Sequence, residues 1–156
     1  MATVAKPDEQ FMREALKEAE LALPSRDRAI GAIIVHQNRV IARAHHQVKL
    51  LRDPTAHAAV IAITQAANAL QSDELAEAVI YVTQEPCPMC AGAVLLSGAA
   101  RLVIGALDAK SGACGSVVDL TNNERLNRRL TVTKEVLAGE CYALIRRSAA
   151  NAQIGS

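Results

Sequence analysis

A chain of 156 residues suits one domain, long enough to bury about two-thirds of its unfolded surface. Its residues are 51% apolar but only 2% aromatic, and its net charge is +1, which argues against a protein that coats nucleic acid through charge or base stacking. The chain shows no signal-peptide pattern and no uninterrupted apolar span. We therefore expect a cytoplasmic protein without a membrane partner, whose four cysteines stay reduced.

Helical and extended patterns alternate along the chain. The first half predicts a helix over about 8–23, strands over 29–36 and 40–44 joined by a turn at 37–39, a polar segment over 45–54 and a helix over 55–70. The second half predicts a strand over 79–83, a helix over 88–97, a strand over 101–105, a loop over 105–115, a strand over 131–136 and a closing helix. This alternation predicts an α/β fold, a three-layer α/β/α sandwich around a mixed sheet of about five strands. Residues 1–156 would form one domain, with the last few as a mobile tail.

Two cysteines, Cys87 and Cys90, stand three positions apart at the start of an expected helix. At this spacing both sulfurs lie on one side of the first turn, where the positive end of the helix favours thiolate. The pair alone fits a redox site or half of a structural zinc ribbon equally well. Cys114 and Cys141 have no nearby thiol partner, and we interpret them as small buried apolar residues.

A histidine near the start of another expected helix supplies a third metal ligand. Pro54 and Thr55 are typical of a helix start, Thr55 can cap the helix, and His57 would lie in its first turn. One histidine and two cysteines leave one tetrahedral position for water, the open arrangement of catalytic zinc. The sequence thus predicts one zinc ion held by His57, Cys87 and Cys90.

The histidine motif and the Pro-Cys-x-x-Cys motif at 86–90 resemble those of the zinc-dependent cytidine and nucleobase deaminases. Further segments (53–58, 81–83, 85–92, 105–116, 126–128 and 136–138) are similar to the bacterial tRNA adenosine deaminases, so the resemblance spans about 11–144. It implies a cytidine deaminase-like fold and zinc-dependent deamination of adenosine to inosine at the tRNA wobble position. It also implies the tRNA anticodon loop as partner, and a homodimer whose interface includes the helix that begins at Cys87.

One departure concerns the chemistry itself. In this family a glutamate two residues after the ligand histidine moves protons between water, ring and departing amine, but this chain has Ala59 there. Because that glutamate is not a ligand, the zinc site should survive, while turnover should fall by about 10²–10⁴-fold. Either the glutamate was replaced deliberately, which we favour because the other catalytic elements are retained, or the chain is a naturally silent partner subunit.

Other departures concern the substrate. His46 replaces an asparagine that touches the target nucleoside in the tRNA-acting branch, and Leu107 replaces an arginine that could meet a phosphate. An exposed loop histidine without contacts is the alternative reading of His46. The further substrate contacts that the resemblance implies are Ile30, Ala58, Glu85, Pro86, Asp108 and Lys110.

Two alternative functions follow. The first is deamination of a free base or purine nucleoside, or of single-stranded DNA, by a variant pocket. The second is a structural zinc module that presents a protein-binding surface, which three protein ligands and an α/β core argue against.

Overall fold

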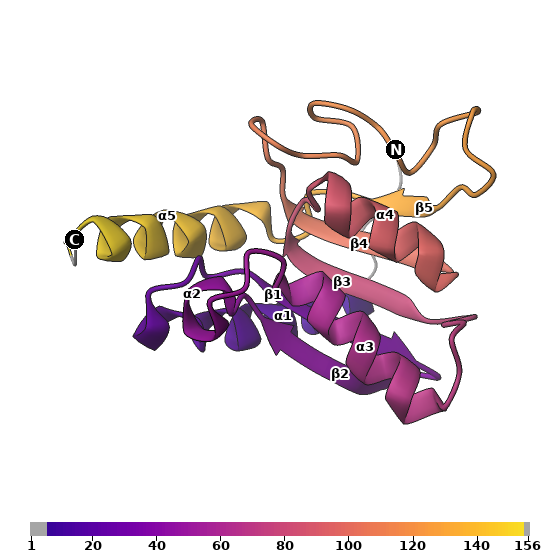
Figure 1. The fold of residues 1–156 in the computed structure, drawn as a ribbon, viewed down its shortest axis with the longest axis horizontal. Helices are drawn as coiled ribbons and strands as arrows, with labels where there is room; N and C mark the ends of the chain where they lie inside the picture. The colour runs from indigo at the N-terminus through magenta and orange to yellow at the C-terminus, as the bar shows by residue number, and fades with distance from the viewer. Residues whose placement is uncertain (1–5, 155–156) are drawn as a thin grey trace.

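A mixed five-stranded sheet in the order β2-β1-β3-β4-β5 forms the centre of the computed structural model, which describes residues 6–154 (Figure 1). The strands are β1 (Gly31–His36), β2 (Arg39–His45), β3 (Val79–Gln84), β4 (Arg101–Ala106) and β5 (Thr131–Thr133). β1 pairs antiparallel with β2 and β3, whereas β3, β4 and β5 run parallel. The predicted mixed α/β sheet is confirmed.

Helices cover both faces of this sheet. They are α1 (Lys6–Glu20), α2 (Val48–Leu51), α3 (Ala58–Leu70), α4 (Pro88–Ser97) and α5 (Ala138–Ile154), with a 3₁₀ turn η1 (Leu23–Ser25). α3 packs on β1 and β2 and lies beside α4 in front of the sheet in Figure 1, while α1 packs on β1 and β3, and α5 on β4. This layering places the first turns of α3 and α4 next to each other.

The core is built from small and branched aliphatic side chains, as the composition predicts. Ala32, Ile33 and Ile34 of β1 are fully buried. A Cβ atom added at Gly31 would lie 2.2 Å from the carbonyl oxygen of Ala15, so the backbone of α1 rests directly on β1. Close helix–sheet contact thus compensates for the small number of large aromatic side chains in this chain.

The predicted hairpin between β1 and β2 is confirmed. Gln37 and Asn38 both have positive φ angles, of 50° and 64°, as a two-residue type I′ turn requires. This turn matches the right-handed twist of the strands that it joins.

Several predicted bounds were wrong. α1 ends at Glu20, and the turn η1 follows it. α3 begins at Ala58 because the carboxylate of Asp53 accepts hydrogen bonds from the amide and hydroxyl of Thr55, which therefore does not cap the helix. β5 ends at Thr133, and residues 105–106 belong to β4. The end of the expected mobile tail, residues 155–156, lies outside the described residues.

The polar segment over 45–54 contains the short helix α2, which the sequence did not predict. The buried carboxylate of Asp27 accepts the amide hydrogens of Lys49 and Leu50 at 2.7 and 3.2 Å. This contact joins residues about twenty positions apart, so no local sequence pattern predicts α2. None of the helices in the described part of the chain is long and apolar enough to cross a membrane.

A partly buried ion pair joins α1 to the sheet. Arg101 at the start of β4 donates to both carboxylate oxygens of Asp8, at 2.9 and 2.8 Å, and the Tyr81 hydroxyl donates to the same carboxylate at 2.8 Å. Hydrogen bonding from Arg101 outweighs the opposing effect of burial and holds the pKa of Asp8 below its ordinary value of 3.8. The folded state therefore stabilises the charged form of the Asp8 carboxylate.

Acid should weaken the fold through Asp8. Its contribution is present above the unfolded-state pKa, near 3.8, and is lost as the pH falls through the lower pKa of the folded state. Asp8→Asn should remove this part of the pH dependence and lower the free energy of unfolding by about 3 kcal/mol, because it breaks a charged pair whose carboxylate is buried. Urea unfolding between pH 2 and pH 7 measures both effects. The exposed Asp73→Asn is the matched control, and equal curves for the two variants would contradict the prediction.

Candidate active site

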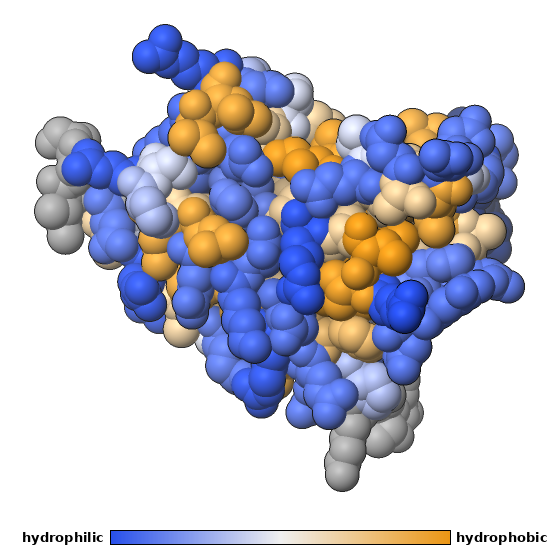
Figure 2. Space-filling view, turned by 90° about the horizontal axis from the view of Figure 1, so that it is seen from below, coloured by the Kyte–Doolittle hydropathy of each residue, from blue (hydrophilic) through white to orange (hydrophobic). Residues whose placement is uncertain are grey.

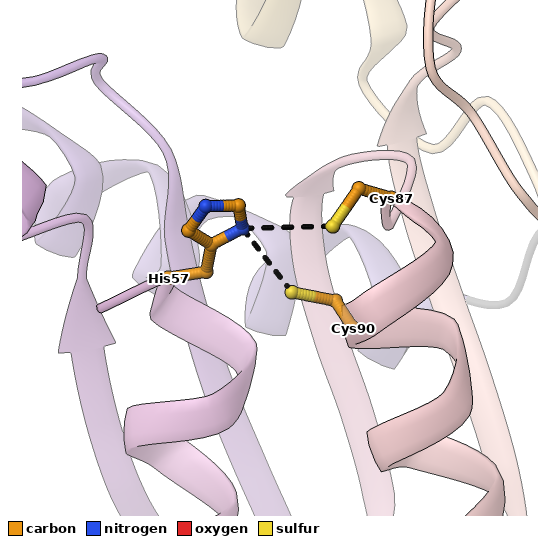
Figure 3. A group of neighbouring side chains, drawn as sticks. All are labelled: His57, Cys87 and Cys90. Atoms are coloured by element: carbon orange, nitrogen blue, oxygen red, sulfur yellow. Dashed lines mark hydrogen bonds between the residues drawn. The ribbon is translucent and has the colours of Figure 1, made fainter. Parts of the chain in front are cut away.

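Two helix starts bring the candidate metal ligands together. His57 is the residue that precedes α3, and Cys87 holds the same position before α4, with Pro88 opening that helix. Cys90 follows in the first turn of α4. Figure 3 shows the imidazole of His57 facing both sulfurs across the gap between the helices. His57 thus lies at the cap position rather than inside the first turn, where the sequence analysis placed it.

The separations of these side chains fit a tetrahedral metal site. Nδ1 of His57 lies 3.6 Å from Sγ of Cys87 and 3.4 Å from Sγ of Cys90, and one ligand atom from each residue lies within 4.8 Å of the others. Typical zinc–nitrogen and zinc–sulfur bond lengths at a tetrahedral angle give a nitrogen–sulfur separation of about 3.5 Å. One imidazole and two thiols are also donors that zinc prefers. The three residues therefore fit a zinc ion.

Burial controls the protonation of these ligands. It raises the pKa of the Cys90 thiol, and the neighbouring Cys87 adds to the effect. Burial also lowers the pKa of His57, which favours the neutral imidazole that binds metals. The direction at Cys90 is opposite to the one expected from the helix start, because burial and the neighbouring Cys87 both disfavour the thiolate.

A cavity opens next to the three donors. Ala59 lines it, two residues after His57 and almost fully buried. The other residues that line it are Arg28, Ile30, His46, Val82, Gln84, Glu85, Pro86, Asp108 and Ser111. Position 59 therefore faces the same space as the metal ligands.

The sequence-predicted substrate contacts divide into two groups. Those that line the cavity are Ile30, His46, Glu85, Pro86 and Asp108. Ala58 is fully buried and does not line it, and Lys110 is exposed, with its backbone amide donating to the carboxylate of Asp108. The sequence analysis did not name Arg28, Val82, Gln84 and Ser111 as site residues, although Val82 and Ser111 lie in segments that carry the family resemblance.

His46 is part of the cavity wall rather than an exposed loop residue. It is 8% exposed, and its Nδ1 accepts the amide hydrogen of Ala58 at 3.1 Å. Its ring stacks on His57 with centroids 4.6 Å apart. Burial, followed by the charges of His57 and Arg28, lowers the pKa of His46 to about 3. The alternative of a loop histidine without contacts is therefore wrong.

Glu85 holds the loop that closes over the cavity. Its carboxylate accepts the amide hydrogens of Asp108, Cys114 and Ser116 at 3.0, 3.0 and 3.1 Å, and it also accepts the hydroxyl of Ser116. Burial opposes the charge of Glu85, but these hydrogen bonds keep its pKa below the ordinary value. The loop over 108–116 is thus fastened to the end of β3 by one charged group.

Comparison with known proteins decides the family. The profile of the MafB19-like deaminases matches residues 6–141. This chain belongs to the MafB19-like deaminase family. It is 42% identical over 138 residues to the tRNA-specific adenosine deaminase of Bacillus subtilis, covering 88% of this chain and 86% of that protein. It is also 42% identical over 135 residues to the enzyme of the same name from Haemophilus influenzae, covering 86% of this chain and 78% of that protein.

Solved structures of deaminases share the fold. A chain from a study of A-to-I editing by tRNA:A34 deaminases superposes with a TM-score of 0.83 at 37% identity, covering 86% of this chain and 98% of that one. The guanine deaminase of Nitrosomonas europaea superposes with a TM-score of 0.75 at 24% identity, covering 96% of this chain and 87% of that one, which shows the fold alone.

Within this deaminase site, the carboxylates that line the cavity are already occupied. Glu85 binds the loop, and the carboxylate of Asp108 accepts hydrogen bonds from the Lys110 amide and from the Ser111 amide and hydroxyl. The methyl group of Ala59 cannot accept or donate a proton. Among the residues that the structure describes, both carboxylates of the cavity lining thus bind the closing loop, and position 59 carries none.

Proposed function

We propose that this chain carries the zinc site of a hydrolytic deaminase that converts adenosine to inosine at the wobble position of tRNA, in a form that is nearly inactive because of Ala59. The observation that carries the proposal is the tetrahedral spacing of His57, Cys87 and Cys90 beside a cavity. The names of the Bacillus subtilis and Haemophilus influenzae relatives support adenosine in tRNA as the substrate. A single domain and a cytoplasmic location belong to the same proposal.

The metal ligands, Glu85 and position 59 have separate roles in the proposed reaction. When bound by His57, Cys87 and Cys90, zinc supplies a Lewis acid that lowers the pKa of water. Glu85 fixes the loop that brings Asp108 and Ser111 to the cavity. Position 59 is where a carboxylate would exchange protons with the substrate. Because Ala59 lacks one, we expect turnover lower by about 10²–10⁴-fold than with glutamate.

Binding to tRNA should survive, and it tests the substrate proposal. We expect the zinc-loaded chain to bind tRNA with an affinity that falls steeply with salt, because each phosphate contact releases counterions. Fluorescence anisotropy at four or more salt concentrations gives the slope. A tRNA whose anticodon begins with guanosine is the control for recognition of the target base. A flat salt response would contradict a polyanionic substrate and favour a free base or nucleoside.

A homodimer through α4 is part of the proposal. The exposed fractions of Met89 and Leu96 on this helix are 38% and 74%, which is high for large apolar side chains. By contrast, the face seen in Figure 2 shows apolar groups separated by hydrophilic ones rather than one continuous patch. The exposed apolar side chains of α4 support the burial of this helix against a second copy of the chain.

A further inference from the structure

Arg28 places a positive charge at the rim of the cavity. It lies just before β1 and lines the space next to the metal donors. Its Nη2 donates to Oε1 of Gln84 at 3.1 Å. The ion pairs found among the described residues do not include Arg28. A guanidinium has five N–H donors and no acceptor, so Arg28 retains donors for a ligand.

Gln84 adds two more donors to the same wall. Its side chain is only 7% exposed and lines the cavity at the end of β3. Because Arg28 can only donate, the amide oxygen of Gln84 must face it, which leaves the NH₂ group. Within the described residues this NH₂ group has no hydrogen-bond partner, so it is available to a ligand.

His46 completes the wall. Its Nδ1 accepts the amide hydrogen of Ala58, so in this arrangement the ring hydrogen is on Nε2. Nε2 has no protein partner in the part of the chain that the structure describes. His46 therefore presents a donor as well, at the position where the resemblance places contact with the target nucleoside.

The two carboxylates that line the same cavity accept hydrogen bonds from the closing loop. The carboxylate of Glu85 accepts four hydrogen bonds from the closing loop, and that of Asp108 accepts three within the loop. Ala59 adds no acceptor. These three side chains of the cavity lining thus offer donors, and the charge of Arg28 lies near enough to Asp108 to help lower the pKa of that carboxyl.

We propose that Arg28, Gln84 and His46 form a donor wall that selects nucleotides by an acceptor oxygen, either a phosphate oxygen or a keto oxygen of the base. This inference rests on the proposed function, because it assumes that the cavity takes a nucleotide. Adenosine without its phosphate offers neither kind of oxygen, whereas adenosine 5′-monophosphate offers the first and cytidine the second. A charged donor that meets such an oxygen strengthens binding by about tenfold to a hundredfold.

The test compares three ligands on the zinc-loaded chain by calorimetry: adenosine, adenosine 5′-monophosphate and cytidine. We expect the monophosphate or cytidine to bind at least about tenfold more tightly than adenosine. Arg28→Met should abolish this difference between the ligands. Arg39→Met removes the same charge from the exposed start of β2, away from the cavity, and should retain the difference.

A preference for the monophosphate identifies the phosphate as the source of the oxygen, and a preference for cytidine identifies the base. Equal affinity for all three ligands, no binding of any of them, or an equal loss for all three in Arg28→Met would overturn the proposal. The tRNA salt series on the unsubstituted chain tests the proposed function separately. If the chain does not bind tRNA but binds cytidine more tightly than adenosine, and Arg28→Met abolishes that preference, the proposed function is refuted and the donor wall is supported.

Discussion

Ala59→Glu is expected to raise the rate of inosine formation in tRNA by about 10²–10⁴-fold. Position 59 lies in the first turn of α3, two residues after His57, and lines the cavity beside the metal donors. A carboxylate there would face the reacting groups, and the positive end of the helix would favour its charge. The measurement is single-turnover deamination of a tRNA with adenosine at the wobble position, using zinc-loaded protein.

Ala59→Gln is the matched control for this experiment. Glutamine has nearly the same shape as glutamate but cannot exchange a proton, so it should leave the rate at the level of the unsubstituted chain. A similar gain with glutamine would show that side-chain size, not proton transfer, limits the rate. If Ala59→Glu is folded and zinc-loaded but inert on tRNA and on purine and pyrimidine nucleosides, the chain is a silent partner subunit.

Cys90→Ser is expected to reduce bound zinc from equimolar to near zero after dialysis against a weak chelator. The change replaces one of three protein ligands by a hydroxyl, which is a poor zinc donor. Inductively coupled plasma mass spectrometry measures the ratio of metal to protein. Cys114→Ala is the control, because Cys114 is equally buried but lies outside the donor cluster, and it should keep the metal.

The folded state of the metal-free variant separates two kinds of zinc site. The sheet and its aliphatic core do not depend on the donors, so we expect Cys90→Ser to keep the circular dichroism of the unsubstituted chain. Unfolding on loss of the metal would instead favour a structural zinc module. Retention of equimolar zinc by Cys90→Ser would contradict the ligand assignment.

The elements that the sequence predicts well are those with strong local signals. The hairpin at 37–38 follows from its turn residues, and α4 follows from Pro88 and the apolar run after it. The pair Cys87 and Cys90 is predicted as metal donors because its short spacing is a local property, whereas the expected cap at Thr55 was wrong and His57 takes that position.

The cavity wall was harder to predict because its contacts are remote in sequence. Arg28 and Gln84 are hydrogen-bonded although they lie 56 positions apart in the sequence. Asp27 accepts a hydrogen bond from an amide of α2 about twenty residues further along the chain. The burial of His46 likewise depends on its stacking against His57 and not on its neighbours in the chain. Pairwise contacts of this kind leave no periodic signal in a single sequence.

X-ray absorption at the zinc edge of the unsubstituted chain tests the central claim most directly. The donor cluster predicts two sulfur atoms, one imidazole nitrogen and one further light atom around each zinc ion. A shell of four sulfur atoms, or protein that holds no stoichiometric zinc when supplied with it, would contradict the deaminase site.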